Sequence, residues 1–335
     1  MRRVRGRTRA GPYDPADMAR PRPLTVGVVH TASSPCRCHA SLLPALRRLG
    51  HRAFAVDADA LPAGLARLAA ADAVFDVTDT LRGEGWLRAQ VRAELERSGA
   101  TLVGPCAAAA ARADDKAASR RAWEEAGVAV APGVALEHAS DRVPARLPPP
   151  FVVKAAHAHG SRGLSFQPTR RAAEAAARRI LRRGDTAVVE SFVAGDEVTV
   201  TLVGRPLRAL PPVAVRLPSA AGAGAVLSFA RKWTGFRGSG APRGRLAVAT
   251  LPSALARRVV ATARAAARAL DLDGFVRIDL RVTPDGRPVV LEANPRPSVE
   301  AGGDATVAAD AAGWGYDTLV ARLLPRAARR ARRAR

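Results

Sequence analysis

The sequence predicts an α/β protein that begins with a parallel sheet and continues with further strands and helices. Strand-like and helix-like segments alternate with short joins over residues 24–105, which favours parallel strands with crossover helices. A strand–turn–strand pattern near the C-terminus, Val276–Pro297, predicts a hairpin. The chain has 335 residues, enough for two or three subdomains, and it contains no run of 18 apolar residues that would predict a membrane-spanning helix.

The first third of the chain carries apolar strand patterns separated by amphipathic segments that end at glycines. The buried pattern TVGVV sets the first strand. The expected strands are 25–29, 52–56, 73–77 and 101–103, and the expected helices are Ala40–Leu49, Leu61–Ala71 and Trp86–Ser98. Because the first strand–helix turn has no G-x-G-x-x-G, the sequence does not predict dinucleotide binding.

The middle of the chain combines lysines with a loop suited to phosphates. A helix is expected over Ala107–Ala126 with Lys116 inside it, and the strand Phe151–Lys154 ends in a second lysine. Six residues later, Gly160–Gly163 is a small-residue loop whose backbone N–H groups can fold over phosphates. The remaining expected elements are the helices Arg171–Arg183, Pro252–Leu270 and Tyr316–Leu324, the strands Ala187–Val193, Val198–Val203, Pro211–Leu217 and Val226–Phe229, and the loop Gly235–Gly244.

The net charge of +23 raises the hypothesis of nucleic-acid binding, but its distribution weakens that hypothesis. Seven arginines lie in the first 22 residues and six in the last ten, which we expect to be flexible tails. Two tyrosines and four tryptophans offer few surfaces for base stacking. The odd number of cysteines, three, predicts a reducing, cytoplasmic location. Cys36-Arg37-Cys38-His39 could suggest a zinc site, but no second Cys/His pair lies at zinc-finger spacing from it.

Rare residue types single out four positions before any motif is considered. Of 53 basic residues only Lys116, Lys154 and Lys232 are lysines, and Asn294 is the only asparagine. In a composition this rich in alanine and arginine, a lysine is expected where a compact ammonium contacts phosphate oxygens as a point charge.

The C-terminal hairpin carries polar side chains at alternate positions. With Val282 opposite Arg287 at the turn, Arg277 lies opposite Glu292 and Asp279 is diagonal to it. The residues expected to share this face are Arg277, Asp279, Val290, Glu292 and Asn294. Hard oxygen ligands beside a guanidinium suit Mg²⁺ that holds phosphates. A solvated hairpin face with a surface ion pair is the alternative.

The order of these parts resembles the ATP-grasp superfamily and, within it, the D-alanine–D-alanine ligase-like branch. The most specific stretches are RADDKAASRRAWEEAGVAVAPG, PFVVKAAHAHGSRGLSF, VVESFVAGDEVTV and VRIDLRVTPDGRPVVLEANPRP. The resemblance implies an ATP-grasp fold, with an N-terminal α/β domain and two α+β lobes that hold ATP between them. The implied divisions are a basic tail 1–22, an N-terminal domain 23–106, a central ATP-binding lobe 107–205, a C-terminal catalytic and Mg²⁺ lobe 206–324 and an arginine-rich tail 325–335.

By the resemblance, three groups of residues form the site. The residues expected to bind ATP are Lys116, Lys154, Gly160, Ser161, Gly163, Glu190, Val193, Glu197 and Lys232. Those expected to bind two Mg²⁺, with Mn²⁺ as the alternative, are Asp279, Glu292 and Asn294. The expected catalytic residues are Arg277, Lys232 and Ser161. Within the first group, Glu190 and Val193 are expected at the adenine and Glu197 at the ribose, although an edge strand with Glu190 facing water is an open alternative.

The implied activity joins a carboxylate to an amine. The carboxylate attacks the γ-phosphate of ATP to give an acyl phosphate, and the amine then displaces phosphate through a tetrahedral intermediate. Such chemistry requires charge neutralisation by Mg²⁺, lysines and an arginine. The expected partners are small-molecule carboxylate and amine substrates, with no membrane, nucleic acid only through the tails, and a homodimer as an open alternative to a monomer.

Two departures from the family concern the acceptor side of the site. The first loop, HTASSPCRCH, has no carboxylate, whereas family members that join D-alanine carry an acidic residue there. Trp233 stands where a tyrosine often follows the third lysine. An amino acid or a peptide-like metabolite is therefore the expected substrate. True D-alanine–D-alanine synthesis, nucleic-acid binding and a catalytically inactive scaffold are the alternatives.

Overall fold

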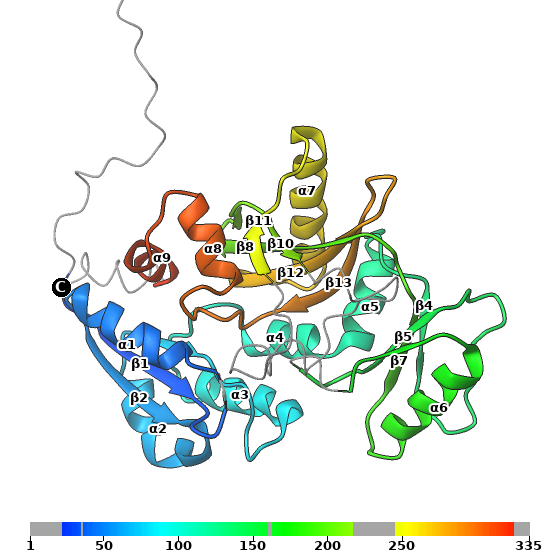
Figure 1. Cartoon of the computed structure of the whole chain (residues 1–335). Helices are drawn as coiled ribbons and strands as arrows, with labels where there is room; N and C mark the ends of the chain where they lie inside the picture. Colours follow the sequence, from blue (N-terminus) through cyan, green and yellow to red (C-terminus); the bar gives the residue numbers. More distant parts are fainter. Residues whose placement is uncertain (1–21, 35, 160–162, 217–244, 325–335) are drawn as a thin grey trace, which may run out of the picture.

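Figure 1 shows the computed structural model, which describes residues 22–34, 36–159, 163–216 and 245–324. Three sheets form its framework, and each is built from a successive stretch of the chain. The N-terminal sheet lies below the C-terminal sheet in Figure 1, and the central sheet stands to their right. The predicted α/β class with an N-terminal parallel sheet is confirmed.

The N-terminal sheet is parallel, in the order β2–β1–β3. Its elements are β1 (Thr25–His30), α1 (Cys38–Arg48), β2 (Arg52–Asp57), α2 (Leu61–Ala69), β3 (Ala73–Asp76) and α3 (Arg88–Arg97), with short 3₁₀ turns at Ala58–Ala60 and Gly85–Leu87. The strand expected at 101–103 is reduced to a single bridge between Val74 and Leu102. Gly104 turns the chain there with a φ of +94°, and it packs so closely on Gly274 that a Cβ on Gly274 would lie 2.9 Å from the Gly104 Cα.

The central lobe rests on an antiparallel sheet in the order β4–β7–β5–β6. Its elements are β4 (Gly133–Leu136), β5 (Phe151–Ala155), β6 (Ser165–Gln167), α6 (Arg170–Leu181) and β7 (Ala187–Ser191). The alanine face of α6 packs against the apolar side chains of β5 and β7. One face of this sheet is therefore covered, and the other is left to meet the C-terminal lobe.

The helix expected over Ala107–Ala126 is in fact two helices. α4 (Ala107–Asp114) ends where Asp115 takes an extended backbone, and α5 (Lys116–Glu125) begins at the next residue. The Asp115 carboxylate accepts hydrogen bonds from two backbone N–H groups of α5, at 2.8 and 3.0 Å, which is N-cap geometry. The aspartate thus breaks the helical pattern and places Lys116 at the start of α5.

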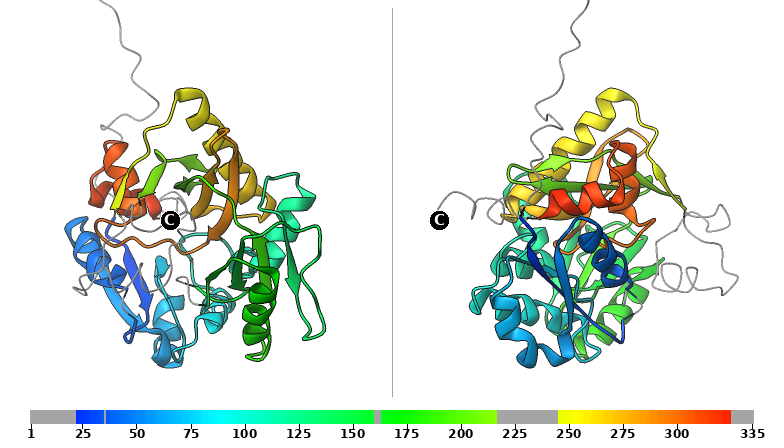
Figure 2. Two further views of the ribbon diagram at one scale, coloured as in Figure 1. Left: turned by 45° about the vertical axis from the view of Figure 1, so that its right-hand side comes forward. Right: turned by 90° about the vertical axis from the view of Figure 1, so that its left-hand side faces the viewer.

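The C-terminal lobe is an antiparallel sheet in the order β11–β10–β8–β12–β13, with β9 on β8. Its elements are β8 (Asp196–Gly204), β9 (Arg208–Ala209), β10 (Val213–Arg216), β11 (Arg245–Val248), α7 (Ser253–Ala269), β12 (Gly274–Val282), β13 (Pro288–Asn294), α8 (Asp304–Ala311) and α9 (Tyr316–Leu323). α7 shares one apolar core with β8 and β12. α8 and α9 share another with α1 and β1, so these two helices pack against the first domain, as the turned views of Figure 2 show.

The register of the β12–β13 hairpin differs from the prediction. Arg277 pairs with Asn294 and Asp279 pairs directly with Glu292, and the register then shifts by one residue so that Leu280 pairs with Val290. This β-bulge inserts one extra residue, Leu291, into β13. The prediction that Val290 shares the polar face is therefore wrong.

The bulge allows Val290 and Ala293 of β13 to face the same core. Val290 and Ala293 are three residues apart, so a regular strand would point them to opposite faces. Both lie in the core beneath α7, because the extra residue between them restores the same side. The edge of β13 is covered as well, since the Val290 N–H donates to the Ala129 carbonyl at 2.9 Å.

Candidate active site

The hairpin brings Arg277 and Asp279 together on one face of β12. The Asp279 carboxylate accepts two bonds from the guanidinium, from Nε at 2.6 Å and from Nη2 at 2.9 Å. The remaining nitrogen, Nη1, lies 3.1 Å from an oxygen of Asp304 at the start of α8. Thr199 of β8 donates its hydroxyl to the other Asp304 oxygen at 3.1 Å. Arg277 is thus held between two carboxylates, and Asp304 is a residue that the sequence analysis missed.

Burial and charge act in opposite directions on this group. Burial disfavours the positive charge of Arg277, but Asp279 and Asp304 outweigh that effect and raise its pKa. Burial also raises the pKa of Asp279, and the charges of Glu292 and Asp304 add to the rise against the opposing effect of Arg277. A cation beside Asp279 would therefore relieve an electrostatic cost that the fold imposes.

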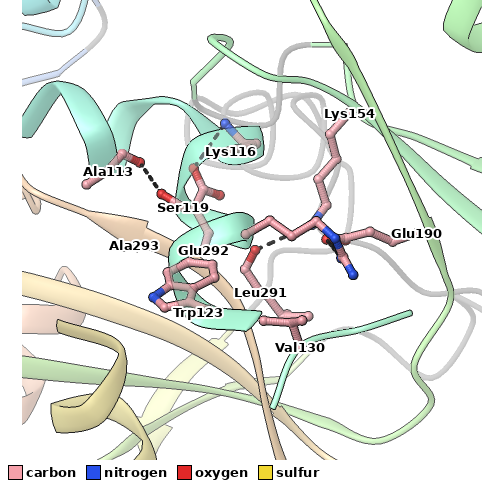
Figure 3. A pocket seen from close by; sticks show the side chains of 11 residues that line it. Ala113, Lys116, Ser119, Trp123, Val130, Lys154, Glu190, Leu291, Glu292 and Ala293 are labelled. Carbon is pink, nitrogen blue, oxygen red and sulfur yellow. Dashed lines mark hydrogen bonds and ion pairs between the residues drawn. The ribbon is translucent and has the colours of Figure 1, made fainter. Parts of the chain in front are cut away.

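Lys116 approaches the same hairpin from the first turn of α5, as Figure 3 shows. Its Nζ lies 3.4 Å from Oε1 of Glu292 and donates a second bond to the carbonyl of Ala158. Ala158 comes two residues before Gly160–Gly163 in the sequence. Lys116 therefore contacts both Glu292 of the hairpin and the segment that leads into the predicted phosphate loop.

Lys154 and Glu190 form a buried pair on the facing lobe. Their side chains are each 10% exposed, and Nζ of Lys154 lies 2.6 Å from Oε2 of Glu190. β7, which carries Glu190, is an inner strand between β4 and β5, so the interpretation of Glu190 as a water-facing residue of an edge strand is wrong. Lys154 also donates to the carbonyl of Leu291 at 3.4 Å, and this bulge residue connects the two lobes.

Arg120 is the other partner of Glu190, and the sequence analysis missed it. Its Nη1 lies 3.3 Å from Oε1 of Glu190. Gly133, opposite Glu190 on β4, makes room for this contact, because a Cβ there would lie 2.9 Å both from Nη1 of Arg120 and from Cγ of Glu190. A larger residue at 133 would clash with both groups and with the Val189 carbonyl, 2.7 Å from such a Cβ.

These contacts outline a pocket between the central and C-terminal lobes (Figure 3). Two lysines, an arginine and two carboxylates enclose it, with Trp123 as its aromatic side chain. Its lining residues are Ala113, Lys116, Ser119, Arg120, Trp123, Val130, Lys154, Glu190, Leu291, Glu292 and Ala293. A densely charged phosphate chain is the kind of ligand that such an alternation of cations and anions can accommodate once metal ions neutralise the anions.

Arg281, a residue that the sequence analysis passed over, contacts both Val193 and Glu197. Arg281 of β12 donates to the Val193 carbonyl at 3.1 Å, and its Nη2 lies 2.9 Å from Oε2 of Glu197. The guanidinium also lies over the ring of Phe192, 5.1 Å from its centroid. The signal was present, because Arg281 follows Arg277 and Asp279 on the same face in a strict two-residue period.

Asn294 follows Glu292 on β13 and pairs with Arg277 across the hairpin. Its side-chain oxygen accepts the backbone N–H of Arg296 at 3.0 Å. Gly163 adopts a φ of +70°, which glycine reaches without strain. The predicted site residues Gly160, Ser161 and Lys232, together with Trp233 and the strand Val226–Phe229, lie outside the described residues.

The donor set on the hairpin fits a hard divalent cation. Asp279 and Glu292 face each other across adjacent strands, and Asn294 adds an amide oxygen two residues further on. Oxygen-only donors of this kind suit Mg²⁺ or Mn²⁺ and do not suit Zn²⁺. Within residues 22–324, outside the gaps, no cluster of three or more His, Cys, Asp and Glu side chains is arranged around a metal position. Ligands beyond the carboxylates would therefore come from Asn294 and from a bound molecule.

A second ionic cluster lies where the N-terminal domain meets the other lobes, and we call it the junction network. It consists of Asp76, Arg88, Arg92, Asp114 and Arg296. Asp76 lies 3.3 Å from both Arg92 and Arg296, and Asp114 binds Arg88 and Arg296. Arg92 further donates to the carbonyls of Val103 and Pro105. Nothing in the sequence pattern pointed to this network.

Comparison with known proteins relates most of the chain to one family. A family model described as "D-ala D-ala ligase C-terminus" matches residues 123–325. The chain is 33% identical over 304 residues to a D-alanine–D-alanine ligase of Anaeromyxobacter sp., covering 88% of this chain and 92% of the relative. It is 30% identical to a D-alanine–D-alanine ligase of Cupriavidus metallidurans, with 84% of each chain covered. The chain belongs to the D-alanine–D-alanine ligase family.

Solved structures of this family share the fold. A D-alanine–D-alanine ligase of Bacillus anthracis complexed with ATP superimposes with a TM-score of 0.72 at 19% identity, covering 92% of this chain and 98% of the other. The VanG D-Ala:D-Ser ligase of Enterococcus faecalis superimposes with a TM-score of 0.71 at 16% identity, covering 90% and 99%. The predicted resemblance to the ATP-grasp ligases is confirmed.

Family membership also decides the class of function. The chain is a ligase of a family that uses ATP to join a carboxylate to an amine, and its partners are small molecules. This outcome favours the ligase hypothesis over the nucleic-acid hypothesis raised by the charge of +23. Among the described residues, no helix is both long and apolar enough to cross a membrane.

Proposed function

We propose that the chain activates a carboxylate as an acyl phosphate and transfers the acyl group to an amine, with an amino acid or a peptide-like metabolite as substrate. The observation that carries this proposal is the meeting of four groups from two lobes. Asp279 and Glu292 pair across the hairpin, Lys116 lies against Glu292, and Lys154 reaches the bulge from the facing strand. This arrangement can hold an anionic phosphate chain between cations and metal-binding oxygens.

We assign the roles as follows. Lys116 and Lys154 bind ATP phosphates, and the Gly160–Gly163 loop, with Ser161, covers them. Glu190 and Val193 lie at the adenine, Glu197 at the ribose, and Lys232 near the phosphates. Asp279, Glu292 and Asn294 hold two Mg²⁺ ions, which would neutralise phosphate charge when bound.

Arg277 acts on the transferred phosphate in this scheme. Its guanidinium presents several N–H donors in one plane, which suits a phosphoryl group with developing charge. In the structure these donors are engaged by Asp279 and Asp304. A cation that takes over the Asp279 oxygens would free two of them, while Asp304 keeps the guanidinium in place.

The acceptor side supports a substrate other than two D-alanines. The loop after β1 carries no carboxylate to bind an ammonium group in the family manner. Synthesis of D-alanyl-D-alanine with a carboxylate placed elsewhere is the alternative. We further propose a cytoplasmic location. The chain is either a monomer or a homodimer, and light scattering of the purified chain would distinguish the two.

The test uses the full chain with ATP, Mg²⁺ and a panel of D- and L-amino acids and dipeptides, alone and in pairs. We expect phosphate release that depends on the acceptor, and a product whose mass is the sum of the two substrates less one water. A product of two D-alanines would establish the alternative. No turnover with any pair, together with no ATP binding by calorimetry, would refute the proposal.

A further inference from the structure

Two cysteines lie in contact in the loop between β1 and α1. The Sγ atoms of Cys36 and Cys38 are 3.0 Å apart. Both are free thiols, Cys36 is half-buried, and Cys38 is 1% exposed as the first residue of α1. The site described above uses neither of them. No third His, Cys, Asp or Glu joins them in a metal-binding arrangement among the described residues, so a bound zinc ion does not explain the pair.

Several donors converge on the sulfur of Cys38. Ser298 lies 3.3 Å away, and its oxygen already accepts the N–H of Glu300, which leaves its own hydrogen for the sulfur. The hydrogen bond from the Cys36 thiol lowers the pKa of Cys38, and bonds from Ser298 and the Val299 N–H add to this, against burial and the charge of Glu300. The hydrogen bond to Cys38 and burial raise the pKa of Cys36, so Cys38 is the thiol that loses its proton more readily.

We propose that Cys36 and Cys38 form a redox-active dithiol that a peroxide closes to an intramolecular disulfide. The donors that converge on Cys38 favour the thiolate at this sulfur, and the thiol of Cys36 lies beside it. The Cys38 thiolate attacks one peroxide oxygen, so that an S–O bond forms, the O–O bond breaks and hydroxide leaves. The Cys36 sulfur then gives up its proton, attacks the Cys38 sulfenic acid and displaces a second hydroxide. The two protons complete two waters, and two electrons pass from the sulfurs to the peroxide.

The contact with Ser298 links this dithiol to the active-site hairpin. Ser298 follows Asn294 by four residues, and Arg37, between the two cysteines, donates its backbone N–H to Glu300 at 3.5 Å. The loop after β1 and the segment after β13 are therefore joined at the sulfurs. If the proposed function holds, these segments border the acceptor side, so closing the disulfide should change the use of the acceptor more than the use of ATP.

The first experiment needs no enzymatic activity. The reduced full chain is exposed to increasing hydrogen peroxide, quenched with catalase, unfolded, alkylated and weighed intact. We expect the number of alkylated cysteines to fall from three to one, with a loss of two hydrogens that dithiothreitol reverses. Trypsin cleaves after Arg37, so the disulfide would appear as a covalent link between two tryptic peptides.

Cys106 provides the matched control, because it is an exposed thiol with no cysteine neighbour to pair with. We expect the Cys36/Cys38 pair to be lost about tenfold faster than Cys106, since the thiolate is the reactive form. Cys106→Ser should close the bond like the wild type, and Cys36→Ser and Cys38→Ser should form no reversible intramolecular link. The proposal is overturned if Cys36 and Cys38 stay alkylatable while Cys106 is oxidised, or if the recovered links join two chains.

A second experiment addresses the coupling, which rests on the proposed function. In the acceptor-dependent assay, the oxidised Cys106→Ser protein should show a several-fold change in the KM for the acceptor with an unchanged KM for ATP. Dithiothreitol should restore the original value. An unchanged acceptor KM would refute the coupling while leaving the disulfide established. A chain with no ligase turnover would still give a decisive result in the mass measurement.

Discussion

The hairpin site and the junction network are built from the same residue types, but we assign ligand binding to the first and a structural role to the second. In the hairpin site, Arg277 is bound by Asp279 and Asp304, and Lys116 by Glu292. In the junction network, three arginines surround two aspartates. Both place arginine–aspartate pairs away from bulk water. They differ in how far water and ligands can reach them.

Exposure separates the two clusters. The side chain of Glu292 is 37% exposed, that of Asp304 is 17% and that of Asp279 is 14%. In the junction network, Asp76 is fully enclosed and Arg92 and Arg296 are at most 2% exposed. The carboxylates of the hairpin can therefore exchange a protein cation for one that arrives with a ligand. Those of the junction network are far less accessible, because the side chains of Asp76 and Asp114 are at most 5% exposed.

The balance of charge separates them as well. Three carboxylates and two cations make the hairpin site an acceptor of positive charge, whereas three guanidinium groups and two carboxylates leave the junction network with one positive charge in excess. The comparison shows that burial and the sign of the net charge together distinguish a binding site from a structural ionic cluster, although the residue types are the same.

The largest effect should follow from Asp76→Asn, which leaves three buried arginines with one carboxylate. We expect a loss of about 3–5 kcal/mol in the free energy of unfolding, because charges are left buried without a partner. Urea denaturation monitored by circular dichroism measures it. The double variant Asp76→Asn with Arg296→Met restores the original balance of charge and should recover much of the loss. Equal stability of the wild type and Asp76→Asn would remove the structural role assigned to the junction network.

Glu292→Gln should give the reverse pattern. It keeps the shape of the side chain and removes the charge of a proposed metal ligand, so we expect phosphate release to fall roughly 100-fold or more. The melting temperature should stay close to that of the wild type, because Glu292 is partly exposed. Asp285→Asn is the matched control, since it removes the same charge from the exposed turn of the same hairpin. Normal turnover by Glu292→Gln would contradict the metal assignment.

The sequence predicted four members of the hairpin site, but not Asp304, because those four lie close together in a period of two. Arg277, Asp279, Glu292 and Asn294 fall within one hairpin, and the scarcity of lysine pointed to Lys116 and Lys154. The parallel sheet was likewise predicted from local alternation of strands and helices. Local patterns of this kind depend only on neighbours along the chain.

The junction network and the bulge could not be predicted in this way. Arg296 meets Asp76 across 220 residues and Asp114 across 182, and no periodicity relates such positions. The bulge at Leu291 arises because Val290 and Ala293 both pack beneath α7, a requirement that exists only after the lobe is assembled. The break at Asp115 was also not predicted, although an aspartate inside a helical pattern is a recognisable N-cap signal that could have indicated it.

The exposure of the Asp304 side chain, 17%, lies between that of Glu292 in the hairpin site and that of Asp76 in the junction network. Replacing Asp304 therefore tests whether it acts as a binding-site residue or as a structural one. We expect Asp304→Asn to lower kcat about tenfold, because a charged hydrogen bond to Arg277 becomes a neutral one worth about 1.4 kcal/mol less. The KM for ATP and the melting temperature should change little. Asp310→Asn, on the exposed end of the same helix, is the matched control. A large loss of stability would instead place Asp304 with the structural residues.

The smallest expected effect on stability concerns two histidines that are two residues apart in the sequence and have opposite pKa shifts. The hydrogen bond that Nδ1 of His157 donates to Asp185 at 2.8 Å raises the pKa of His157, with Asp115 adding to the rise against burial. For His159, burial and then the charges of Arg88, Lys116 and Arg296 lower the pKa. His157 thus belongs with the carboxylates of the central lobe, and His159 feels the positive excess of the junction network.

The sign of each shift fixes the pH dependence. A raised pKa at His157 means that its stabilisation is complete below its usual pKa of 6.5 and is lost as pH rises through the raised value. His157→Gln should therefore destabilise the fold most below pH 6.5, by a few tenths of a kcal/mol because the side chain is half exposed, and the difference should close at higher pH. Melting curves across that range test it, with the exposed His138→Gln as control. A difference that grows with pH would contradict the raised pKa of His157 and the part assigned to Asp185 and Asp115.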